Sequence, residues 1–89
     1  MDLEKQIIKD ITQKRKLVKQ MKEIVEEDDL LFFHYGIGRY IRNKYLWQYP
    51  ENIKTLSNLY GIDNVDDISF ILAQKIYFKV TGKQIKIDI

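Results

Sequence analysis

The stretch Phe32–Tyr49, FFHYGIGRYIRNKYLWQY, decides how we expect this chain to fold. Aromatic, aliphatic and basic side chains alternate in it with two glycines, and it holds no acidic residue. Apolar residues recur at intervals of three or four, which predicts a helix from Leu30 to about Tyr45. Its expected buried face consists of Leu30, Phe33, Ile37 and Ile41. We expect Tyr35, Arg39 and Arg42 to lie to the side of that face.

Two glycines interrupt this predicted helix. Gly36 and Gly38 each cost about 1 kcal/mol relative to alanine inside a helix. Such a cost suggests that another backbone or a ligand approaches closely there. The triplet is not a dinucleotide-binding fingerprint, because Ile41 takes the place of the third glycine and no strand precedes it.

Before this stretch, residues 1–28 predict one long amphipathic helix, regular from about Leu3 to Glu27. It contains no glycine or proline, and its apolar positions repeat with helical spacing. Roughly 25 residues at 1.5 Å each give a helix nearly 40 Å long, more than a domain this small can cover. We therefore expect part of it to project or to pair with another helix. Basic residues precede acidic ones along it, so antiparallel copies could match: Lys14, Arg15, Lys16, Lys19 and Lys22, then Glu23, Glu26, Glu27, Asp28 and Asp29.

After the stretch, two further helices are expected. One runs from Glu51 to Tyr60, buries Ile53, Leu56 and Leu59, and ends at Gly61. Asn64 caps the next, which carries Asp66 and Asp67 in its first turn, where carboxylates favour the positive helix end. That helix stops at Thr81-Gly82, with this expected inner face: Ile68, Ile71, Leu72, Ile76 and Val80.

The predicted architecture is a small all-α, four-helix domain with a long N-terminal helix and a short extended C-terminal tail. The tail, Gln84 to Ile89, alternates apolar and polar residues and is either a strand or an arm laid over the core. We read residues 1–89 as a single domain, with residues 29–89 as its helical core. Asp28 or Asp29 caps the second helix in this prediction.

Composition excludes several function classes. The 89 residues contain no cysteine and one histidine, so disulfides and thiolate metal sites are excluded and we predict no metal and no cofactor. A domain of this size gains little stability from its own core, which makes a second copy or a protein partner an expectation. A net charge of +2 does not by itself imply a polyanion. Neither a signal peptide nor a membrane-spanning run is visible, so we expect a cytoplasmic protein without a membrane role.

The glycine and arginine motif resembles a family of small bacterial proteins classed as a domain of unknown function. The resemblance covers residues 30 to 87 and leaves the first helix outside. Val65 stands where the family tends to have proline, and Tyr40 where it tends to have tryptophan. The family implies no activity. The motifs that carry the resemblance are Phe33-His34-Tyr35-Gly36-Ile37-Gly38-Arg39-Tyr40-Ile41-Arg42-Asn43, Leu46-Trp47, Gly61-Ile62 and Asp66-Asp67-Ile68-Ser69.

Two readings of the central stretch remain open. In the functional one it is an interaction surface, whose arginines hold phosphate or carboxylate oxygens while aromatic rings stack on a ligand. In the other, Trp47, Tyr35 and Tyr49 complete the core and the arginines pair with the acidic residues of the last helix. We favour the second reading, because large aromatics at helical spacing more often belong to a core. The candidate surface is His34, Arg39, Tyr40, Arg42, Lys44 and Trp47; the candidate structural motif is Gly36, Gly38, Asp66 and Asp67.

No set of residues predicts catalysis. His34 lies beside an apolar residue, where a lone histidine is usually a hydrogen-bonded structural group. Thr55, Ser57 and Ser69 are expected to be caps or surface hydroxyls. We therefore predict that the protein is not an enzyme.

Helix-turn-helix recognition is also disfavoured. A short helix, a glycine turn and a longer helix follow one another from Leu56 to Tyr77, but Asp66 and Asp67 would meet phosphate. If the protein binds nucleic acid, the better candidate surfaces are the basic and aromatic face at residues 39–47 and the block from Lys14 to Lys22.

The sequence therefore leaves the function unknown and favours a small non-catalytic protein-interaction module. Its first helix is the expected element for self-association or for a protein partner. One alternative is a small nucleic-acid-binding protein that uses residues 39–47. Another is a protein of a mobile element or phage that inhibits a host protein.

Overall fold

The computed structural model describes residues 2–23 and 33–83, and at positions 33 and 34 it describes the backbone alone. All regular structure in these two ranges is helical, which confirms the all-α prediction. Five helical stretches lie in them. They are α1 (Leu3–Thr12), α2 (Arg15–Lys22), a central stretch of η2 (Phe33–Ile37), α4 (Gly38–Ile41) and η3 (Arg42–Leu46), α5 (Pro50–Tyr60) and α6 (Val65–Thr81).

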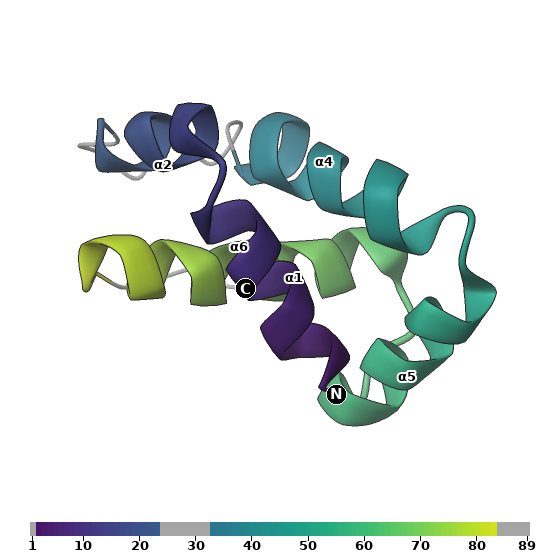
Figure 1. Ribbon diagram of the computed structural model, residues 1–89. Helices are drawn as coiled ribbons and strands as arrows, with labels where there is room; N and C mark the ends of the chain where they lie inside the picture. The colour runs from purple at the N-terminus through teal and green to yellow at the C-terminus, as the bar shows by residue number, and fades with distance from the viewer. Residues whose placement is uncertain (1, 24–32, 84–89) are drawn as a thin grey trace.

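The last helix, α6, organises the fold. It contacts α1, α2, every part of the central stretch, and α5. Figure 1 shows α1 crossing it, while α2 and the central stretch lie along another side of it. Fully or nearly fully buried apolar side chains from every stretch meet in one core: Ile7, Ile11, Met21, Ile37, Ile41, Leu46, Leu56, Ile68, Leu72, Ala73, Ile76 and Tyr77.

The prediction of one long N-terminal helix is wrong. α1 ends at Thr12, and Lys14 has extended backbone angles, φ −87° and ψ 98°, before α2 begins. A straight helix would carry Met21 about 15 Å beyond Ile11, past the reach of a small core. The bend brings α2 back onto α6, so that Ile7, Ile11 and Met21 all have no exposed surface.

The bend leaves its backbone groups satisfied. Gln13 donates its amide hydrogen to the Asp10 carbonyl over 3.2 Å, and Lys14 donates to the Ile11 carbonyl over 2.9 Å. No glycine or proline marks the position. Up to residue 23, the apolar side chains that suggested pairing through the first helix therefore contribute to the core of this fold.

The predicted ends of the two later helices are confirmed. Gly61 and Gly82 follow α5 and α6 in the left-handed conformation, with φ of +72° and +73°. Asn64 accepts hydrogen bonds from the amides of Asp66 and Asp67 at the start of α6. The expected burial of Leu59 is wrong, because it lies on the outer side of α5 with 58% exposed, whereas Leu56 is buried.

Other predictions fall on residues or side chains that the structure does not describe. They concern the acidic block after residue 23, the cap at Asp28 or Asp29, the buried role of Leu30 and Phe33, and the tail from Gln84 to Ile89. Among the helices that the structure describes, none combines the length and the apolar character needed to cross a membrane.

Candidate interaction surface

The central stretch, residues 33–46, contains two wide helical turns, at Phe33–Ile37 and Arg42–Leu46. Trp47 donates its amide hydrogen to the Arg42 carbonyl, five residues back, over 2.8 Å. Such π-turns are rare and often occur at functional sites. They raise the mean repeat of the stretch toward roughly four residues per turn, so residues four apart line up along it.

This repeat divides the stretch into two faces. The inner face is buried and packs against α6; it consists of Ile37, Gly38, Ile41, Arg42 and Leu46. The outer face is exposed and continues into the following turn; it consists of Tyr35, Arg39, Asn43 and Trp47. The predicted candidate surface is therefore split between an inner and an outer group.

Arg42 belongs to the inner group. It is 7% exposed, and its guanidinium donates a hydrogen bond to the Ser69 hydroxyl over 2.9 Å. Its Nε lies 3.5 Å from an oxygen of Asp66. Ser69 in turn donates to the Asp66 carbonyl over 2.8 Å. These contacts tie the central stretch to the first turn of α6.

Ser69 is fully buried, so its expected role as a cap or surface hydroxyl is wrong. No sequence signal joins Arg42 to a serine 27 positions away. Asp67 is exposed and makes no ion pair within the described residues. Of the two predicted acidic partners, Asp66 alone meets an arginine in this part of the chain.

Tyr40 and Lys44 lie on the flank toward α1, where both donate hydrogen bonds to Asp10. The Tyr40 hydroxyl donates to the Asp10 carboxylate over 3.2 Å, and the Lys44 ammonium donates to it over 3.0 Å. The Tyr45 hydroxyl donates to the same oxygen. This cluster fastens α1 to the central stretch, and no pattern in the sequence indicated that Asp10 would join it.

The cluster shifts the pKa values of its members. Burial acts to raise the pKa of Asp10, but hydrogen bonds from Tyr45 and Lys44 outweigh it and the pKa falls below its ordinary value. Burial and the bond to Asp10 raise the pKa of Tyr45 to about 12. Hydrogen bonds to Tyr40 and Asp10 raise the pKa of Lys44. Each shift favours the protonation states that the cluster has at neutral pH.

The outer face has the opposite character. Trp47 is 57% exposed, and Tyr35 and Tyr49 are exposed as well. The reading in which these three aromatics complete the core is therefore wrong. Arg39 is exposed and makes no ion pair with any residue that the structure describes. The His34 prediction concerns a side chain that the structure does not describe.

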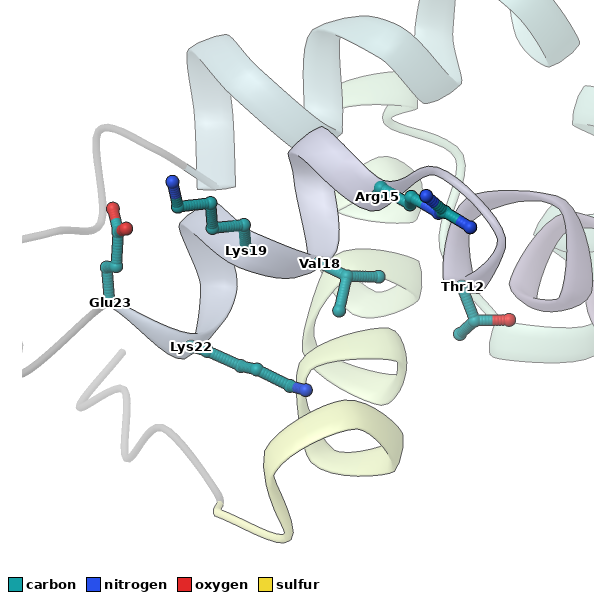
Figure 2. A pocket seen from close by; sticks show the side chains of 6 residues that line it. All are labelled: Thr12, Arg15, Val18, Lys19, Lys22 and Glu23. Atoms are coloured by element: carbon teal, nitrogen blue, oxygen red, sulfur yellow. The ribbon is translucent and has the colours of Figure 1, made fainter.

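A separate groove of about 480 Å³ runs along α2. Figure 2 shows Lys22 extending toward the last turns of α6, with Arg15 and Thr12 at the other end. Lys19 also lines it, and Glu23 contributes one acidic group. Three cations against one carboxylate make the groove basic.

No cluster of three or more histidine, cysteine or acidic side chains suited to a metal ion occurs in the described ranges. No family model, curated protein or solved structure matches the chain. The resemblance to a family of unknown function therefore stays a prediction.

Proposed function

We propose that the protein is a small, non-catalytic, cytoplasmic module that binds another protein through the outer face of its central stretch. The observation that carries the proposal is the exposure of Trp47, the chain's single tryptophan, on the same outer face as the exposed Arg39. Tryptophan, tyrosine and arginine are the residue types most enriched at the centres of protein interfaces. Trp47 shares the exposed face with Tyr35 and Arg39, so this face combines the residue types that interfaces favour.

The contrast with other residues of the predicted candidate surface supports this assignment. Arg42, Tyr40 and Lys44 each have partners within the fold. Arg39 and Trp47 do not contribute to the core, so their exposure on one face needs a reason other than folding. Recognition of a protein surface supplies that reason without a nucleophile, a base or a metal.

Capture from the native cell tests the proposal. Tagged wild-type protein is compared with Trp47→Ala, and Phe78→Ala is the matched control, because Phe78 is a similarly exposed aromatic on α6. We expect the same set of proteins with the wild type and the control, and its loss with Trp47→Ala. Equal recovery with all three would overturn the proposal.

A second candidate function is nucleic-acid binding, favoured by the basic groove along α2. Its cations, Arg15, Lys19 and Lys22, could contact successive phosphates. Binding should then weaken steeply with salt, and Lys19→Gln together with Lys22→Gln should abolish a mobility shift. No shift at low salt would remove this candidate.

A further inference from the structure

We propose that the outer face is occupied by a second copy of this chain, with Trp47 of one copy seated between α1 and α5 of the other. This inference rests on the proposed function and names its partner. Two features carry it: a groove of suitable chemistry on the chain itself, and the distribution of charge around Arg39.

The receiving groove lies between the start of α1 and the outer side of α5. It has a volume of about 690 Å³. Leu3 and Leu59 give it apolar surface, and Leu59 is 58% exposed. An indole ring that lay over these two leucines would bury apolar surface on both copies, which is the main gain in such contacts.

Polar groups surround that apolar patch. Asp2, Asn52 and Asn58 also line the groove. An indole N–H needs an acceptor once it leaves water, and carboxylate or amide oxygens provide one. The Asn52 amide nitrogen already donates to the Tyr45 carbonyl, which leaves its side-chain oxygen as an acceptor.

Charge determines which surfaces can meet. Residues 33–50 contain no acidic side chain, so the same face on two copies would bring Arg39 against its own counterpart. The groove has the opposite sign: Asp2 lines it and its other described lining residues are uncharged, while Lys5 and Lys54 lie elsewhere on α1 and α5. The outer face of one copy therefore complements the groove of another better than it complements itself.

One groove and one aromatic anchor make a small contact, so we expect association in the micromolar to millimolar range. Sedimentation over that range should show a mass that rises above the 10.7 kDa of one chain. Trp47→Ala should weaken association about tenfold or more, and Leu59→Lys should do the same from the other side. Phe78→Ala should leave it unchanged.

A mixture of the two variants gives the decisive result. Trp47→Ala keeps the groove and Leu59→Lys keeps the indole, so each alone should be monomeric while the mixture forms a pair. The only tryptophan in that mixture belongs to the Leu59→Lys copy. Its fluorescence should therefore shift to the blue, and become protected from quencher, as the Trp47→Ala copy is added.

A mixture that stays monomeric, or a wild-type protein that stays monomeric at every concentration, overturns the inference. If the wild type is monomeric and capture from cells still depends on Trp47, a different protein occupies the outer face and the proposed function stands. A Trp47-dependent shift of single-stranded nucleic acid would instead assign the face to that ligand. Loss of Trp47 dependence in both association and capture would remove both proposals.

Discussion

Arg39 and Arg42 are three residues apart on one helical stretch, and their surroundings are opposite. Arg42 is nearly fully buried, between Ser69 and Asp66 of α6. Arg39 is exposed and forms no ion pair in the ranges described by the structure. The comparison teaches that one short motif places its two arginines in different surroundings: the inner one joins two helices, and the outer one is exposed on the surface of the described fold.

The largest expected effect is that of Arg42→Ala. The change removes a buried hydrogen bond and an ion pair, and it leaves Ser69 and Asp66 with fewer partners. We expect the free energy of unfolding to fall by about 2 kcal/mol, measured by urea denaturation. Arg39→Ala is the matched control and should change it by less than about 0.5 kcal/mol. Equal losses in the free energy of unfolding would contradict the assignment of Arg42 to the inner face and Arg39 to the outer face.

Asp10→Ala should have the next largest effect. It removes the shared acceptor of Tyr40, Lys44 and Tyr45, and with it the contact between α1 and the central stretch. We expect a loss of about 1 to 2 kcal/mol in the free energy of unfolding. Lys5→Ala, an exposed position on the same helix, serves as control. An unchanged free energy of unfolding in Asp10→Ala would mean that the hydrogen bonds to Asp10 do not stabilise the fold.

Alkaline pH should weaken the hydrogen bond that Tyr45, on the flank toward α1, donates to Asp10. The pKa of Tyr45 rises from 10.0 to about 12 on folding, so its contribution is complete below pH 10 and is lost as the pH rises through 12. Wild-type protein should lose about 1 kcal/mol more across this interval than Tyr45→Phe. Tyr49→Phe, at an exposed position just after the central stretch, should follow the wild type. Parallel curves for all three proteins would contradict the role given to Tyr45.

The smallest effect on stability is expected for Trp47→Ala. More than half of this side chain is exposed, so its removal should change the free energy of unfolding by less than about 0.5 kcal/mol. Thermal unfolding at low protein concentration checks this. A loss above about 2 kcal/mol would place Trp47 in the core and remove the basis of the outer face.

Much of the fold was predictable from local chemistry. Asn64 predicted the start of α6 and Gly61 the end of α5, because capping depends on the residue at one position. The buried face of Ile37 and Ile41 followed from periodicity. The bend at Lys14 did not, since no local signal marks it and its cause is the limited size of the core.

The candidate site was predictable only in part. Sequence identified the segment and its arginines, but not which of them faces inward. The two wide turns lengthen the helical repeat, so that Trp47 lines up with Tyr35 and Arg39 on the exposed face. Ser69 and Asp10 were missed because their partners are 27 or more positions away and are set by tertiary packing.

Fluorescence of the single tryptophan tests the central claim most directly. In dilute protein, Trp47 should be readily quenched by a soluble quencher, and its emission should barely change when urea unfolds the chain. A blue-shifted, protected emission in the dilute folded protein, moving strongly to the red on unfolding, would contradict the account, because Trp47 would then belong to the core.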